Sequence, residues 1–153
     1  MKKKTILIVI LSIVCFGSCC DIDDTFENEN NSKPFISIWK TDESGYTEDN
    51  QIEIPGFGRN YKIYWEEIGN LTNNGTETAT NSHTITFPKS GIYKVYISGG
   101  TPAFHQIKFS SPLLNNNKRD NNKIISIEQW GNIEWSSFDH AFCSCYALEI
   151  NWG

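Results

Sequence analysis

The sequence lacks several features by which common classes of protein are recognised. Basic residues are few, because 13 Lys and Arg face 18 Asp and Glu in 153 residues, a formal net charge of −5. The basic stripe of a nucleic-acid-binding protein is therefore missing. No apolar run is long enough for a stable transmembrane helix, and no Gly-x-Ser-x-Gly, His-Glu-x-x-His or P-loop motif is present. We accordingly expect no nucleic-acid partner, no enzymatic activity and no cofactor.

Aromatic residues, in contrast, make up 13% of the chain and include five Trp. This is enough apolar material for a hydrophobic core, so the chain as a whole is not disordered. The length suits one domain of average size and not two. The composition therefore indicates one β-rich, extracytoplasmic domain and says nothing about its activity.

Residues 1–18 have the organisation of a bacterial lipoprotein signal peptide. Three lysines precede an apolar stretch, Ile6–Phe16, which is too short to span a bilayer comfortably. The sequence Phe-Gly-Ser-Cys at 16–19 then has the form of a lipobox, in which small residues admit the peptidase and the thiol accepts diacylglycerol. We predict cleavage before Cys19 and lipid attachment at Cys19. The alternatives are attachment at Cys20 in a shifted frame, or an ordinary secretory signal.

Residues 19–33 are predicted to form an acidic flexible tether. Five acids and no base lie in the stretch 21–29, a composition typical of a solvated linker. Removal of residues 1–18 leaves ten basic residues against 18 acidic ones, a net charge of −8. The acidic run after the lipidated cysteine resembles the surface-export signal of Bacteroidetes lipoproteins, although a plain charged linker is the alternative. We expect a protein lipid-anchored to the outer membrane, facing the cell surface and not spanning the bilayer.

Short segments rich in Ile, Tyr, Phe, Thr and Trp follow the tether and are predicted to be strands. Apolar and polar residues alternate most cleanly in Tyr61–Glu66 and Ile92–Ser98. In the first of these, Tyr61, Ile63 and Trp65 share one face, and Trp65 is expected in the core. The turn at 88–91 predicts a hairpin, and the Asn/Thr-rich stretch at 70–76 is predicted to be a loop. The spacing predicts a mainly β fold, with a β-sandwich over 34–122. The predicted strands are Phe35–Lys40, Gln51–Ile54, Tyr61–Glu66, His83–Phe87, Ile92–Ser98, Phe104–Phe109 and Lys123–Glu128.

These strands carry a family resemblance. Tyr-x-Ile-x-Trp at 61–65, His-Thr at 83–84, Phe87 and Gly-x-Tyr-x-Val-x-Ile at 91–97 resemble a PKD-type immunoglobulin-like domain. The loop at 66–70 departs from the Trp-Gly-Asp-Gly pattern of that family. The resemblance implies an immunoglobulin-like sandwich, in which His83 has a structural role.

Residues 123–153 carry a more specific resemblance. Ile-Glu-Gln-Trp-Gly-Asn-Ile at 127–133, followed by Ala-Phe-x-x-Cys-x-x-Leu at 141–148, is similar to the BspA-type leucine-rich-repeat surface lipoproteins of Bacteroidetes. In those proteins a PKD-like region leads into the repeats. The resemblance implies that 123–153 form a junction and a single truncated repeat. It also implies a non-enzymatic binding or adhesion module for a protein or glycan ligand.

The repeat is expected to contain a short helix that runs through Phe142, with Ser136 or Ser137 as its N-cap. Trp130 and Trp135 are expected to pack at the junction. The side chains expected to line the core of the repeat are Phe138, Phe142 and Leu148. Because a single repeat does not bury its own apolar face, one alternative is a truncated copy of a longer repeat protein, which need not be functional.

Two further functions stay open. A carbohydrate-binding accessory lipoprotein would present exposed rings for stacking on sugars, and the candidates are Tyr46, Phe57, Tyr64 and Tyr96. An enzyme or inhibitor would need a concave site with converging polar groups. The ligand-binding residues of the chain are not identified by the sequence.

The residues that could carry chemistry form no standard site. His140, Cys143 and Cys145 have zinc-ligand side chains, but the spacing is not a standard one and no fourth ligand is evident, so no metal site is predicted. A disulfide between the two cysteines would close a very small ring, strained if helical, and stays open as an alternative. The acids at 66–67 would point to opposite faces of a strand, which does not suit paired acid–base catalysis.

The C-terminal residues show a strand pattern. Leu148, Ile150 and Trp152 alternate with polar residues, which indicates a strand with one apolar face. An uncovered strand edge promotes association. We therefore expect Ile150 and Trp152 to be partly exposed, and the last segment to be either mobile or the contact point for another chain, including a second copy of this one. The alternative is a segment that folds back to complete the sandwich.

Overall fold

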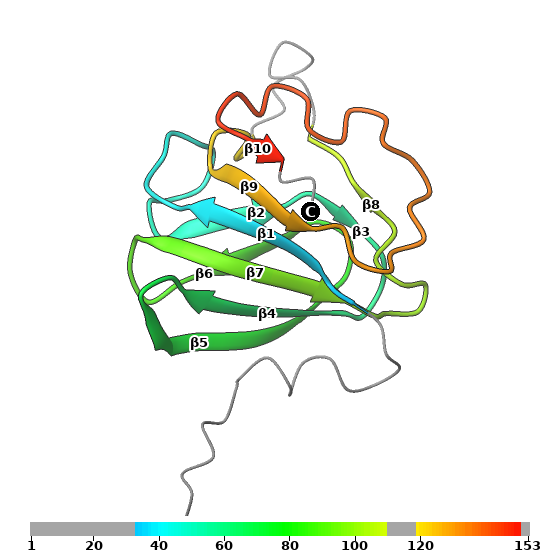
Figure 1. The fold of residues 1–153 in the computed structure, drawn as a ribbon, viewed down its shortest axis with the longest axis horizontal. Helices are drawn as coiled ribbons and strands as arrows, with labels where there is room; N and C mark the ends of the chain where they lie inside the picture. Colours follow the sequence, from blue (N-terminus) through cyan, green and yellow to red (C-terminus); the bar gives the residue numbers. More distant parts are fainter. Residues whose placement is uncertain (1–32, 110–118, 151–153) are drawn as a thin grey trace, which may run out of the picture.

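Six strands form the main sheet of the protein, in the order β10-β9-β1-β7-β4-β5 (Figure 1). The computed structural model describes residues 33–109 and 119–150. All neighbours in this sheet are antiparallel except β9 and β10, which are parallel. The strands are β1 (Phe35–Lys40), β4 (Tyr61–Glu67), β5 (Asn70–Ala79), β7 (Ile92–Ser98), β9 (Ile124–Gln129) and β10 (Glu149–Ile150).

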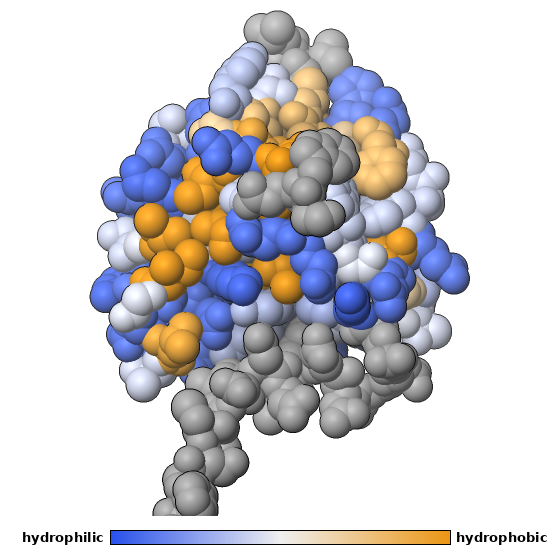
Figure 2. All heavy atoms as spheres, viewed as in Figure 1, coloured by the Kyte–Doolittle hydropathy of each residue, from blue (hydrophilic) through white to orange (hydrophobic). Residues whose placement is uncertain are grey.

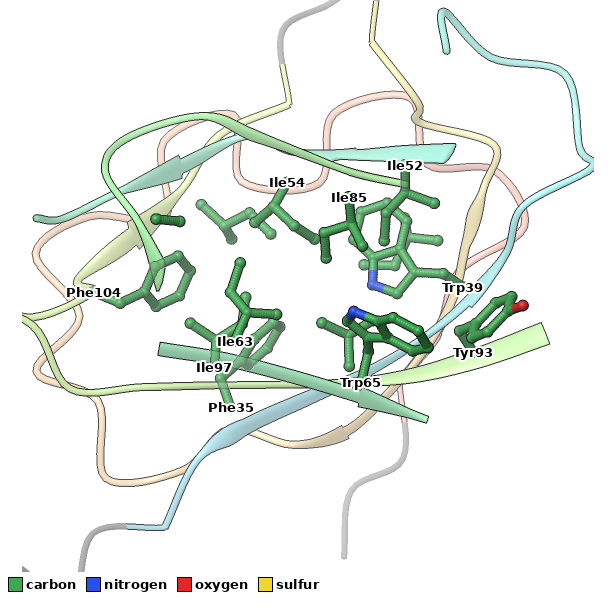
Figure 3. Close-up of a cluster of buried hydrophobic side chains, with 14 of the residues drawn as sticks. Phe35, Trp39, Ile52, Ile54, Ile63, Trp65, Ile85, Tyr93, Ile97 and Phe104 are labelled. Atoms are coloured by element: carbon green, nitrogen blue, oxygen red, sulfur yellow. The ribbon is translucent and has the colours of Figure 1, made fainter. Parts of the chain in front are cut away.

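Two short ribbons form a second layer behind this sheet (Figure 1). One pairs β2 (Gln51–Ile54) with β6 (His83–Thr86), and the other pairs β3 (Gly56–Phe57) with β8 (Gln106–Ile107). The core lies between the layers, and Figure 3 shows Ile52 and Ile85 pointing toward Ile63 and Ile97 from the opposite side. The prediction of a mainly β fold is therefore confirmed. Within 33–109 and 119–150 no helix is long and apolar enough to cross a membrane.

The alternation of apolar and polar residues sets which face of each strand is buried. Tyr61 and Ile63 are fully buried and Trp65 is 7% exposed, whereas Lys62 between them is exposed. Successive side chains of a strand point to opposite faces, so one apolar row is enough to orient the strand. The predicted core position of Trp65 is confirmed, and six of the seven predicted strands lie within one residue of their expected bounds. The seventh, Phe104–Phe109, is reduced to β8.

The hairpin predicted around 88–91 is wrong. Strand β6 pairs with β2 in the second layer, whereas β7 pairs with β1 and β4 in the main sheet. Ile85 and Tyr93 are both fully buried, so the two strands cover the core from opposite sides. The turn at 88–91 therefore crosses between layers.

The loop predicted at 70–76 is also wrong, because these residues belong to the edge strand β5. Gly75 lies opposite Trp65 in the ladder with β4. A Cβ atom at Gly75 would lie 2.5 Å from Cζ2 of Trp65, so the glycine leaves room for the indole ring. Backbone pairing with β4 thus overrides the low strand propensity of Asn and Gly.

A buried polar network ties the loop at 41–50 to the start of β9. Asp120 and Lys123 are both fully buried. The Asp120 carboxylate accepts hydrogen bonds from three backbone N–H groups and the Thr47 hydroxyl, at 2.6–3.0 Å. The Lys123 ammonium donates to that hydroxyl and to three backbone carbonyl oxygens, at 2.8–3.0 Å. The Thr47 hydroxyl therefore joins the two ionisable side chains, and burial lowers the pKa of Lys123.

Candidate functional site

Packing of aromatic rings organises the segment between β9 and β10. Trp130 contacts Trp135 with 5.9 Å between ring centroids, and Trp135 contacts Phe35 of β1 at 5.4 Å. The two tryptophans therefore pack at the junction with the main sheet, as expected. Phe142 is partly buried against the core, but Phe138 is 55% exposed and so does not line it as predicted.

The helix predicted from Ser136 or Ser137 through Phe142 is wrong. Isolated backbone hydrogen bonds, such as Ala141 N to Phe138 O at 3.1 Å, close separate turns instead. His140 and Ser144 have φ angles of 55° and 62°. These angles belong to the left-handed region, which cannot continue a right-handed helix. The result is a chain of single turns that follows the edge of the core.

An open groove of about 810 Å³ lies along this segment. Its apolar lining comes from Trp130, Phe138, Phe142 and Ile150, so both ends of the segment contribute to it. Trp130 contacts the rings of Phe138 and Phe142 with centroid separations of 5.7 and 6.0 Å. Ile150 is partly exposed, as the alternation at the C-terminal end predicts. The groove is therefore lined by aromatic rings and by a residue of β10, the outer strand of the main sheet.

Charged side chains at the groove are already paired. The Asp139 carboxylate accepts hydrogen bonds from Lys108 Nζ at 2.8 Å and lies 2.6 Å from His140 Nδ1. The hydrogen bond from Lys108, and then that from His140, lowers the pKa of Asp139. Asp139 and His140 are exposed and Lys108 is partly buried, so the groove has polar side chains beside its apolar lining.

The thiols near the groove are not arranged for catalysis or metal binding. Cys143 and Cys145 are both free, so the disulfide left open by the sequence is not formed. Burial raises the pKa of Cys145 to about 12, which makes its thiol a poor nucleophile at neutral pH. The Cys143 thiol contacts the Ser144 hydroxyl at 3.8 Å and makes no hydrogen bond to His140. Among residues 33–109 and 119–150, no three His, Cys, Asp or Glu side chains form a metal-binding group.

The four rings proposed for sugar stacking do not form one row. Tyr46 is 56% exposed in the loop after β1, and Phe57 is 40% exposed in the second layer. Tyr96 is only 7% exposed and lies beside Tyr64, with 5.3 Å between the ring centroids. Both of these hydroxyls donate to Glu66, and burial, followed by this carboxylate, raises the pKa of Tyr64 to about 12. The rings therefore provide no sugar platform of the predicted kind.

Other predicted residues fall outside the groove. His83 lies 2.5 Å from the Glu77 carboxylate and so links β6 to β5, in agreement with a structural role. Cys19 and Trp152 lie outside the described residues. The pairing of Lys108 with Asp139 was not predicted, because a separation of 31 residues leaves no local signal in the sequence.

No protein-family model, no curated protein and no solved structure matches the chain.

Proposed function

We propose that the protein is a non-enzymatic, lipid-anchored binding module displayed on the cell surface, with the groove as its contact site for a protein ligand. The observation that carries the proposal is the open apolar groove of about 810 Å³. A groove of this size, lined by apolar side chains with a few polar groups at its rim, is typical of a ligand site. Aromatic residues, including phenylalanine, are enriched at protein interfaces, and Phe138 is an exposed one.

The position of β10 favours an extended protein segment as the ligand. Among the described residues, β10 is the outermost strand of the main sheet and pairs with β9 alone. An added strand would form main-chain hydrogen bonds there and would direct one side chain toward the groove. A second copy of the chain is the alternative occupant of the same edge.

The parallel pairing of β10 supports the proposed relation to leucine-rich-repeat surface lipoproteins. Ser126 pairs with Glu149 and Ile127 with Ile150, so each partner lies 23 residues further along the chain. Leucine-rich repeats return to the next parallel strand after about 20–29 residues. We include in the proposal that the strands within 34–122 form a PKD-like domain, and that 123–153 form one coil of this repeat type, without its helix, which adds β9 and β10 to the main sheet.

Replacement of Phe138 by Asp is expected to weaken ligand binding at the groove. A phage-displayed library of random linear peptides, selected on the full-length protein, should yield peptides with a large apolar residue. Their affinity should fall about tenfold or more in Phe138→Asp, because a carboxylate in the groove is costly to desolvate. Fluorescence anisotropy with the selected peptides measures the change.

Phe57→Asp is the matched control, since Phe57 is another exposed phenylalanine but lies on β3 in the second layer. Peptides that bind Phe138→Asp as tightly as the wild type would refute the groove as the site, and a selection that yields no peptide would argue against a peptide-binding function. Gel filtration of the same variants tests self-association. A wild-type oligomer that dissociates only in Phe138→Asp would identify a second copy as the occupant.

Replacement of Cys19 by Ala is expected to abolish lipid attachment. The variant should not incorporate radioactive palmitate and should be released from membranes, because a thiol is needed to accept the lipid. Cys20→Ala is the control and should label normally. Labelling that persists in Cys19→Ala and disappears in Cys20→Ala would move the attachment site to Cys20.

A further inference from the structure

A second cavity, which we call the end cavity, lies at the end of the molecule where β7 finishes and β1 begins (Figure 1). Its volume is about 620 Å³. Three segments that are distant in the sequence form its walls, namely the residue that precedes β1, the loop from β7 to β8 and the segment that follows β9. The end cavity shares no lining residue with the groove, so it is a separate site.

Backbone hydrogen bonds hold the walls of the end cavity together. The Asn132 N–H donates to the Lys33 carbonyl at 2.9 Å, which joins the segment after β9 to the start of β1. The Ser136 N–H donates to the His105 carbonyl at 2.9 Å, which joins the same segment to the loop at 99–105. The cavity is therefore pre-formed by paired backbone, as cavities that bind small molecules usually are.

The lining of the end cavity is partly apolar. Pro102, Ala103 and Ile133 contribute to it, and so does Phe104, whose ring packs against Trp135 with 5.8 Å between the centroids. Figure 2 shows apolar atoms surrounded by hydrophilic ones on this side of the molecule, at the right of the view. A volume of this size, with an apolar lining and a few polar groups, is typical of a site for a small molecule.

Two side chains of opposite charge also line the end cavity. These are Lys33 and Glu134, and both are exposed. Within 33–109 and 119–150, neither side chain makes an ion pair or a hydrogen bond. His105, a third polar lining residue, has its Nδ1 atom 2.7 Å from the Ala103 carbonyl oxygen. Since a carbonyl oxygen only accepts, Nδ1 carries the hydrogen, and Nε2 of the neutral ring is an acceptor.

We propose that the end cavity binds a short peptide with free ends and apolar side chains, of the size of a dipeptide. Lys33 would pair with the carboxylate of the ligand and Glu134 with its ammonium group, while Ile133 and Pro102 would contact its side chains. A ligand with charge of one sign would meet a like charge in the same cavity, which disfavours it. The proposal does not depend on the function of the groove.

The dipeptide leucyl-leucine tests the proposal, with the full-length protein in nanodiscs of zwitterionic phosphatidylcholine and isothermal titration calorimetry as the measurement. Acetylation of the amino end and amidation of the carboxyl end should each weaken binding several-fold, because each removes one charge. In Glu134→Gln, acetylation should have no further effect, whereas amidation should still weaken binding. Lys33→Gln should show the converse. Both residues are exposed, so both variants should melt as the wild type does.

Ala103→Trp should abolish binding, because Ala103 is an exposed lining residue and the indole ring would fill the cavity. Phe138→Asp is the matched control, since it alters the groove alone and should bind leucyl-leucine as the wild type does. The proposal would be overturned by a wild-type protein that does not bind leucyl-leucine, by full affinity in Ala103→Trp, or by an equal effect of acetylation in the wild type and in Glu134→Gln. Loss of binding in Phe138→Asp alone would assign the dipeptide to the groove and refute the end cavity as its site.

Discussion

Replacement of Trp65 by Ala is expected to remove a large fraction of the folding stability and to lower the melting temperature by many degrees. The indole ring packs edge-on against Phe87 and Tyr93, with centroid separations of 5.1 and 5.7 Å. Truncation of a buried tryptophan costs about 3–5 kcal/mol, from a total stability of about 5–15 kcal/mol for a typical domain. The far-ultraviolet circular dichroism signal, followed during a thermal melt, measures the loss.

Tyr64→Ala provides the control on the same strand. Tyr64 is half-buried and lies on the opposite face of β4, where its hydroxyl donates to Glu66 at 3.1 Å. This variant should fold and should melt closer to the wild type, because a group near solvent leaves no closed cavity when it is removed. A Trp65→Ala protein that melts at the wild-type temperature would show that the register of β4 is shifted by one residue.

Replacement of Asp120 by Ala is expected to destabilise the protein about as much as Trp65→Ala does. The cause is the loss of a buried polar network and not of apolar packing. The variant would leave the N–H groups of Tyr46, Thr47 and Glu53 without their acceptor. It would also remove the anion that faces the fully buried Lys123. Removal of one partner from a buried charged network costs about 3–5 kcal/mol. Urea unfolding followed by tryptophan fluorescence measures the change, and limited proteolysis should cleave the loop at 41–50 sooner.

Glu48→Gln is the control for charge, since Glu48 is an exposed acid of the same loop whose carboxylate makes no hydrogen bond to Lys123. Its stability should stay close to that of the wild type, because exposed charges contribute little. If Asp120→Ala and Glu48→Gln unfolded at the same urea concentration, the network would be an incidental result of folding and not a source of stability.

Most strands of this protein are predictable from its sequence because their signal is local. An apolar row at every second residue, as in Tyr61, Ile63 and Trp65, indicates both the strand and its buried face. The pairing of strands has no such signal. The segments 83–87 and 92–98 are separated only by a short turn, yet they belong to different layers. The apolar row of each strand faces the core, and the two strands cover the core from opposite sides.

The candidate sites were predicted less well than the strands. The expected helix through Phe142 failed because neither the repeat motif nor a serine N-cap reveals the left-handed φ angles of His140 and Ser144. The groove brings Ile150 beside Trp130, and only the parallel pairing of β10 with β9 places these residues together. The backbone hydrogen bond from Ile68 to Ile92 likewise joins two turns that are distant in the sequence.

The sequence by itself determined that this protein is mainly β and that Trp65 faces inward, because a side-chain period of two depends only on neighbouring residues. The tertiary structure alone decided which strands pair across the layers and that β5 forms from an Asn/Thr-rich segment. It also decided that Asp120 and Lys123 are buried together. The physical reason is that partners such as Lys123 and Thr47, 76 residues apart, meet only after the core has closed between them. Contacts of that kind leave no local pattern in the chain.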